Sequence, residues 1–399
     1  MKSFRDWLEK VNQNVIPWRL AFCSNILSLE IPPGFIHDLE SMAGLGRIMP
    51  KVSVVIPNYN HARFLRQRID SVMQQTFQDF EVILLDDFST DGSRSILCEY
   101  ADDPRVRIEF NEKNSGSTYK QWNRGIALAR GEFAWIAESD DYADKRLLEK
   151  LVPILDSDKR VVLAYCRSWR VSADNEISGY LDSCLSDLNP RRWTADFWAD
   201  GREECRNYLV GRNTVLNASS VVFRREVYQQ VGGADESLVY CGDWKTWAAM
   251  ALTGGRIAYV GETLNFYRIH DMSVSAKSKR LGVEAVEYLC VIRWILQKIT
   301  PAEAVRKQVC EEIFHLWGPA VLSSRIPLSR RWAILQDARA IDPRALRRLL
   351  TGFASISAPI VLMRSTVRVR FWHPVLNATR PVRHALGLRQ GKDSSRITK

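Results

Sequence analysis

The stretch that decides the fold is VSVVIPNYN at residues 52–60, followed by SVMQQTFQDFEVILLDDFSTDGS at residues 71–93. Its apolar runs at 52–57 and 80–85 predict two short buried strands. The segment 63–75 between them carries apolar residues on one side of a helix. A strand, a helix and a second strand in this order are typical of a parallel sheet with crossover helices.

The same alternation continues along the chain. Further strands are expected at 106–110, 132–137, 161–166 and 218–224, with helices at 94–101 and 119–129 and an irregular insertion from 168 to about 213. Beyond residue 281 we expect helices only, so a boundary falls near residue 278. The chain then comprises a partly helical N-terminal extension (1–50), an α/β domain (51–278) and a helical, basic C-terminal region (279–399).

The positive charge of the chain is unevenly distributed. The 399 residues carry a formal net charge of +10, with 46% hydrophobic and 26% charged residues, which excludes a chain disordered by composition. Residues 325–399 contain 14 Arg and 2 Lys against 3 Asp, a net charge of +13, so residues 1–324 sum to −3. The basic balance therefore belongs to the C-terminal region and does not indicate nucleic-acid chemistry in the main domain.

Cysteine usage and hydropathy indicate the cellular compartment in which the protein is expected to function. Eight scattered cysteines without a C-x-x-C pair favour a reduced, cytoplasmic chain. The polar N-terminus, MKSFRDWLEKVNQN, lacks the apolar core of a signal peptide, and no run reaches the length of a membrane span. We expect a cytoplasmic protein, with a peripheral position at the inner face of the plasma membrane as the further possibility.

Acidic residues follow the ends of the expected strands. Asp86 and Asp87 come directly after the strand at 80–85, and Asp140 and Asp141 come soon after the strand at 132–137. Ligands of an open parallel sheet bind at this edge, beyond the carboxyl ends of the strands. Each acid alone could be a simple helix cap. Two acidic doublets in one sheet instead favour a divalent cation, because adjacent carboxylates repel each other.

The chain resembles glycosyltransferase family 2, whose members have the GT-A fold. The resemblance extends from Lys51 to about Ser275 and rests on the two quoted stretches together with NSGSTYKQWNRGIALARGEFAWIAESDD at residues 114–141. It implies a mostly parallel open sheet flanked by helices. It also implies an inverting, metal-dependent transfer of a sugar from a nucleotide-sugar donor.

The resemblance assigns the metal and donor contacts to individual residues. Asp141 would bind Mn²⁺ or Mg²⁺, and Asp140 would contact the metal shell or the ribose. Asp87 would accept the ring N–H of the donor base, while backbone groups at Pro57 and Asn58 flank that base. A carboxylate in this role suits uracil, thymine or guanine and disfavours cytosine; we favour UDP or dTDP.

Asp243, in YCGDWKTW, has the position of the catalytic base in the family. It would take the proton of the acceptor hydroxyl as that oxygen attacks the anomeric carbon. The family usually carries an acidic pair here, whereas Gly242 precedes Asp243 in this chain. Alternatively, Asp243 only caps the following helix. His270 would be a further metal ligand, although a lone His is more often structural.

The expected acceptor is a saccharide or lipid-linked saccharide in surface-polysaccharide synthesis. Arg and aromatic residues interleave between Arg364 and Arg389, a pattern that suits an anionic membrane surface. A merely solvated tail is the alternative, and no nucleic-acid partner is expected. Two rival functions are a catalytically silent scaffold that binds nucleotide-sugar or membrane, and a nucleotidyltransferase. The segment PNYNHARF after the first strand lacks the Gly-rich phosphate loop that the latter would need.

Overall fold

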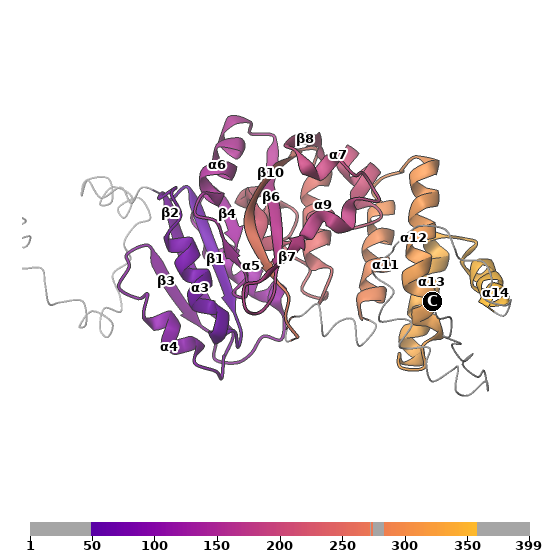
Figure 1. The fold of residues 1–399 in the computed structure, drawn as a ribbon, viewed down its shortest axis with the longest axis horizontal. Helices are drawn as coiled ribbons and strands as arrows, with labels where there is room; N and C mark the ends of the chain where they lie inside the picture. Colours follow the sequence, from indigo (N-terminus) through magenta and orange to yellow (C-terminus); the bar gives the residue numbers. More distant parts are fainter. Residues whose placement is uncertain (1–48, 272, 274–282, 357–399) are drawn as a thin grey trace, which may run out of the picture.

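The computed structural model describes residues 49–271, 273 and 283–356. Within these ranges ten strands form one mixed sheet, in the order β3-β2-β1-β4-β9-β6-β10-β5, with β7 beside β6 and β8 beside β10 (Figure 1). The strands are β1 (Val52–Asn58), β2 (Phe80–Asp86), β3 (Val106–Phe110), β4 (Phe133–Ile136), β5 (Tyr142–Ala143), β6 (Val161–Val171), β7 (Ile177–Tyr180), β8 (Phe197–Asp200), β9 (Val221–Arg224) and β10 (Arg256–Arg268).

The helices lie on both faces of the sheet and beyond its C-terminal part. They are α3 (Ala62–Met73), α4 (Ser93–Cys98), α5 (Thr118–Leu128), α6 (Leu147–Ser157), α7 (Gly201–Glu204), α8 (Arg225–Gln230), α9 (Gly242–Leu252), α11 (Val283–Leu296), α12 (Glu303–Leu322), α13 (Leu328–Ile341) and α14 (Ala345–Ile356). The described residues also form three short 3₁₀ segments, Leu181–Leu185, Arg192–Thr194 and Ala218–Ser220, and one π-helical turn, Cys205–Leu209.

The N-terminal half of the sheet is parallel, as the sequence predicted. β1 pairs in parallel with β2 and β4, and β2 pairs in parallel with β3. The register aligns Asn58 with Asp86, so the residues that follow β1 and β2 emerge together at one edge. This edge carries the acidic doublets, because the carboxyl ends of parallel strands meet there.

The second half of the sheet is mixed, which corrects the expectation of a parallel continuation. β9 lies antiparallel between β4 and β6, and β10 pairs in parallel with β6. The expected strand 218–224 is shorter, because residues 218–220 form a 3₁₀ turn in which Asn217 Oδ1 accepts a hydrogen bond from Ser219 N (2.9 Å). This turn brings Asn217 to the acidic edge instead of extending β9.

Two hydrophobic cores lie on opposite faces of the sheet. Alternate residues of β1 divide between them, with Val54 in one core and Val55 in the other, as the two-residue period of a strand requires. Helices α3, α4 and α6 cover one face, and α5 and α9 cover the other. The core of the second face continues through Leu289, Ile313 and Ile334 into α11, α12 and α13, which stand beyond α9 in Figure 1.

Several predictions concern residues that the structure does not describe. The N-terminal extension 1–48, the expected boundary near residue 278 and the basic segment 364–389 lie outside the described residues. The domain limits at 51, 278 and 279 therefore stay predictions. Among the described helices, none combines the length and the apolar character needed to cross a bilayer.

The close packing of α5 on β1 generates a stability prediction. A Cβ added at Gly125 would overlap Val55 and press against Leu85. Gly125→Ala should lower the free energy of unfolding by about 1–2 kcal/mol, because overpacking outweighs the gain in helix propensity. Urea denaturation measures this change. Gly318→Ala is the matched control, since its added methyl makes only ordinary contact with Phe314, and we expect it to be neutral or stabilising. Equal stability of the two variants would contradict the packing argument.

Candidate active site

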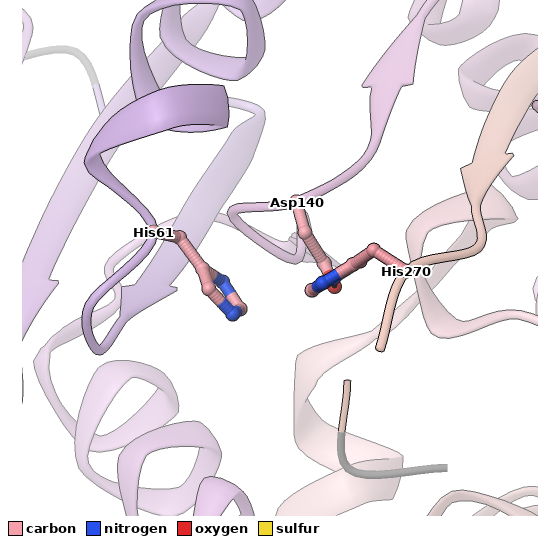
Figure 2. Close-up of side chains that lie close together, drawn as sticks. All are labelled: His61, Asp140 and His270. Atoms are coloured by element: carbon pink, nitrogen blue, oxygen red, sulfur yellow. Dashed lines mark hydrogen bonds and ion pairs between the residues drawn. The ribbon is translucent and has the colours of Figure 1, made fainter. Parts of the chain in front are cut away.

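Three side chains from distant parts of the chain converge at the acidic edge of the sheet. His61 lies between β1 and α3, Asp140 follows β4, and His270 follows β10 (Figure 2). One potential ligand atom of each residue lies within 4.8 Å of the other two. His270 Nε2 lies 2.9 Å from Asp140 Oδ2. Two imidazole nitrogens and a carboxylate oxygen form a donor set that suits a divalent transition metal.

His61 was not predicted as a site residue. Its Nδ1 lies 2.8 Å from Ser139 Oγ, which orients the ring, and its carbonyl accepts the N–H groups of Phe64 and Leu65 at the start of α3. The preceding Asn60 has φ of 56°, a left-handed conformation that Asn tolerates well. No ligand spacing in the sequence reveals this residue. The available signal was its place directly after the turn that ends β1, at the same edge as the acids.

Asp140 and Asp141 have different orientations in the structure. Asp141 is 2% exposed, its Oδ1 accepts a hydrogen bond from Arg268 N (2.8 Å), and its Oδ2 accepts one from Asn217 Nδ2 (3.0 Å). Both oxygens of Asp141 are thus engaged by protein groups. Asp140, not Asp141, lies beside His61 and His270. The metal and ribose contacts expected of Asp140 and Asp141 stay predictions.

The two neighbouring carboxyls differ in their electrostatic environments. Burial raises the pKa of Asp141 to about 6, with a further contribution from the charge of Asp140. Burial would also raise the pKa of Asp140, but the hydrogen bond with His270 and the proximity of His61 outweigh it, and this pKa lies below its ordinary value. Asp140 is therefore the more readily ionised of the pair, as a metal ligand must be.

Two buried arginines hold the acidic loop, residues 138–141 after β4, through hydrogen bonds to its backbone carbonyls. Arg68 Nε donates to Glu138 O (2.8 Å), and burial lowers the pKa of Arg68 to about 10. Arg268 Nε donates to Asp140 O (2.7 Å), and its terminal nitrogens donate to Ser172 O, Ala173 O and Gln67 Oε1. All three guanidinium nitrogens of Arg268 therefore donate to protein acceptors, which holds this side chain in place.

Glu138 stands apart from the cluster. Its Oε1 accepts a hydrogen bond from Trp122 Nε1 (2.6 Å), which directs the carboxyl toward α5. Burial raises its pKa to about 8, with a smaller contribution from Asp140. Glu138 is therefore better suited to hydrogen bonding than to holding a cation.

Asp87 lies where the base of the nucleotide-sugar is expected to bind. Protein groups already donate several hydrogen bonds to its carboxylate. It is 4% exposed, and its Oδ1 accepts hydrogen bonds from Ser115 N (2.8 Å), Gln121 Nε2 (3.0 Å) and Asn111 Nδ2. Oδ2 accepts one hydrogen bond in the described structure, from Ser115 Oγ (2.7 Å). A carboxylate oxygen can accept more than one, so Oδ2 keeps capacity for a ring N–H.

Pro57 and Asn58 end β1 beside Asp87. Asn58 is 2% exposed, its carbonyl accepts from Asp87 N (2.8 Å), and its Nδ2 donates to Asp86 Oδ1 (3.2 Å). Asn58 Oδ1 is buried and has no hydrogen-bond partner among the described residues. A buried acceptor left in this way is costly unless a ligand or water satisfies it. The base contacts of Pro57, Asn58 and Asp87 stay predictions.

Asp243 lies in the first turn of α9, and the N-cap position belongs to Cys241. Asp243 is therefore not the N-cap residue of α9, although it lies in the first turn, and its role as a base stays a prediction. Its Oδ2 accepts a hydrogen bond from Asn213 Nδ2 (3.0 Å), and burial raises its pKa to about 7, although hydrogen bonds from the Trp244 backbone and from Asn213 lower it in part. A carboxyl with this pKa can exchange a proton near neutral pH.

The single acid at this position has a steric cause. A Cβ at Gly242 would overlap the ring of Tyr119, so no acidic side chain fits beside Asp243. Trp244 and Trp247 of α9 are 1% and 0% exposed and belong to the core. One loop joins the two parts of the site, because Asn213 donates to Asp243 while Asn217 donates to Asp141.

Known proteins that resemble this chain in sequence are glycosyltransferases. The family model described as glycosyl transferase family 2 matches residues 53–232. TuaG of Bacillus subtilis strain 168, named as a glycosyltransferase of teichuronic acid biosynthesis, is 37% identical over 228 residues, which cover 57% of this chain and 82% of TuaG. An uncharacterised glycosyltransferase of Rickettsia typhi is 26% identical over 258 residues, covering 64% of this chain and 74% of the relative.

Solved structures agree in fold. Staphylococcus aureus TarS in complex with UDP-GlcNAc has a TM-score of 0.56 at 18% identity, covering 74% of this chain and 82% of that one. The mannosyltransferase PcManGT of Pyrobaculum calidifontis, in complex with GDP-Man and Mn²⁺, has a TM-score of 0.50 at 16% identity, covering 89% and 95%. The predicted GT-A fold and family are thus confirmed, and the chain belongs to glycosyltransferase family 2.

Proposed function

We propose that this glycosyltransferase is inverting and metal-dependent, and moves a sugar from a nucleotide-sugar onto a saccharide or lipid-linked saccharide acceptor in surface-polysaccharide synthesis. One observation carries the proposal: His61, Asp140 and His270 form a cluster at the acidic edge, and the loop 213–217 links the neighbouring Asp141 to Asp243, an acid with a pKa of about 7. The first group suits a metal, and the second suits a general base.

Asp140, His61 and His270 would hold the divalent ion. Such an ion supplies positive charge that stabilises the departing nucleoside diphosphate. Between the two ions expected, the imidazole donors favour Mn²⁺, because Mg²⁺ prefers oxygen ligands in a strict octahedron. The Mn²⁺ complex of PcManGT supports this choice.

Asp243 would accept the proton of the acceptor hydroxyl. Its hydrogen bond from Asn213 fixes the direction of the carboxylate, and its raised pKa strengthens it as a base. A base on the acceptor side and a cation on the nucleotide side are the arrangement that direct displacement at the anomeric carbon requires. The product then has the opposite anomeric configuration.

The donor is proposed to be a UDP- or dTDP-sugar. Asp87 Oδ2 and Asn58 Oδ1 keep acceptor capacity in the region expected to bind the base, and uracil and thymine each offer a ring N–H. The UDP-GlcNAc complex of TarS supports UDP, and the teichuronic acid assignment of TuaG supports a polysaccharide product. Docking of residues 364–389 to an anionic membrane stays a prediction, because they lie outside the described residues.

Metal binding tests the revised assignment of the acids. Asp140→Asn and His61→Ala should each weaken Mn²⁺ binding about tenfold or more, because each removes a donor atom. Asp141→Asn should have a smaller effect on affinity and should mainly lower the melting temperature, because Asp141 holds Arg268 and Asn217. Isothermal titration with Mn²⁺ measures the affinities. His315→Ala, an exposed histidine of α12, is the control. Loss of binding in Asp141→Asn with retention in Asp140→Asn would restore the original assignment.

The pH dependence tests the base. Asp243 must be unprotonated to act, so kcat/KM should fall about tenfold per pH unit below about pH 7 and level off above it. Asp243→Asn should reduce transfer about 100-fold or more while the affinity for nucleoside diphosphate stays nearly unchanged. Steady-state kinetics and titration calorimetry measure the two effects, with the exposed Glu226→Gln as control. A flat profile, or substantial turnover in Asp243→Asn, would remove Asp243 from this role.

A donor screen tests the overall function. With Mn²⁺ present, release of nucleoside diphosphate should occur with UDP- or dTDP-sugars and be weak or absent with GDP- and CDP-sugars. Release from GDP-sugars alone would overturn the base preference. Binding of UDP-sugars without release or transfer, across a panel of saccharide acceptors, would favour the silent scaffold.

A further inference from the structure

Glu287 of α11 points its carboxylate at the loop that leads into α9. It is 7% exposed, and its two oxygens accept three consecutive backbone N–H groups: Oε1 from Val239 (2.8 Å), and Oε2 from Tyr240 (2.7 Å) and Cys241 (2.9 Å). A buried carboxylate that accepts several backbone N–H groups is among the strong hydrogen-bonding arrangements in proteins. Glu287 therefore fixes residues 239–241, two residues before Asp243.

The position of this contact matters because α9 has no side-chain cap of its own. Its N-cap residue, Cys241, makes no side-chain capping hydrogen bond. The first N–H groups of a helix need acceptors, and negative charge near them is stabilising. Glu287, from a helix that follows α9 by some thirty residues in the chain, accepts the N–H of the N-cap residue Cys241 and places a negative charge near the start of α9.

Tyr119 of α5 completes the clamp from the other side. Its hydroxyl accepts a hydrogen bond from Gly242 N (2.9 Å) and donates one to Tyr240 O (3.1 Å). The N–H groups of residues 239–242 are thus all held by two buried side chains from different elements. The next residue in the chain is Asp243.

We propose that Glu287 is a positioning residue, through which the C-terminal helices fix the carboxylate of Asp243 in the active site. The inference rests on the proposed function, because it takes Asp243 as the base. It assigns the residues after 279 a part in catalysis, since the active site is then incomplete without α11. A displacement of about 1 Å in a reacting group can cost a factor of about 100 in rate, so such a clamp has a kinetic consequence.

Glu287 also acts on Asp243 through its charge. The titratable groups that interact with Asp243 are Tyr119 of α5, Tyr240 and Cys241 of the preceding loop, and Glu287 of α11. Burial raises the pKa values of Tyr119, Tyr240 and Cys241, so these three stay neutral near pH 7. Burial is the main cause of the raised pKa of Asp243, and the negative charge of Glu287 raises this pKa further. Substitutions at Glu287 can therefore separate the effect of its charge on the pKa of Asp243 from the effect of its hydrogen bonds on the position of residues 239–241.

Two variants in the full-length chain make this separation. Glu287→Gln keeps the shape and removes the charge, and its NH₂ group opposes one of the loop N–H donors. It should lower kcat about tenfold or more, leave the donor KM within about twofold, and shift the acid limb of the pH profile to lower pH. Glu287→Asp keeps the charge but is one methylene too short to reach all three N–H groups. It should lower kcat while the acid limb stays in place.

The control is Asp342→Asn, which removes a buried carboxylate of the same helical region that pairs with Arg348 and has no contact with the loop 239–241. It should lower the melting temperature without changing kcat or the pH profile. Should Glu287→Gln fail to fold, the kcat and KM of Glu287→Asp decide. A folded Glu287 variant with the kcat and profile of Asp342→Asn would overturn the proposal. Asp243→Asn, assayed in parallel, separates the two hypotheses, because turnover in that variant refutes the base itself and not the clamp.

Discussion

The structure depends on keeping several carboxyls side by side at one edge of a sheet with little water around them. Asp140 and Asp141 are adjacent, and the pKa of Asp141 is raised first by burial and then by the charge of Asp140. The positive charges of Arg68 and Arg268, together with hydrogen bonds to the carboxyls, offset the resulting cost of ionisation. Because each compensating group comes from a different element, satisfying this acidic loop fixes α3, β4 and β10 relative to one another.

This constraint explains why the mixed half of the sheet belongs to the active site. Asp141 is held by Asn217, which begins the turn before β9, and by the backbone of Arg268, which ends β10. A longer β9 would remove Asn217 from this position, and a shorter β10 would remove His270 from Asp140. The position of β9 between β4 and β6 and the length of β10 therefore serve to place Asn217 and His270 beside the acidic residues, in addition to packing the sheet.

The sequence predicted the parallel half of the fold and the edge that bears the site, because buried strands followed by acids leave a local pattern. It could not show that Asp140, and not Asp141, faces the two histidines, since adjacent residues share every local signal and differ only in which partners their oxygens meet. His61 was missed for the opposite reason. Its partners lie 79 and 209 positions away, and only the topology of the sheet brings them together. The antiparallel β9 likewise reflects pairing between distant strands, which apolar runs do not encode.

The two halves of the site differ in what holds them. The cluster of His61, Asp140 and His270 lies at strand ends of the sheet, beside buried arginines. Asp243 instead lies on helix α9, where Tyr119 and Glu287 accept hydrogen bonds from the backbone just before it. Since α11 packs in the same core as α9, the free energy that anchors the C-terminal helices also limits the motion of the base. Under the proposed function, the donor would bind at the edge of the sheet, and the helical region would align the base with the acceptor hydroxyl. The α/β domain and α11 would then act as one catalytic unit, while the excess positive charge lies farther along the chain, in residues 325–399.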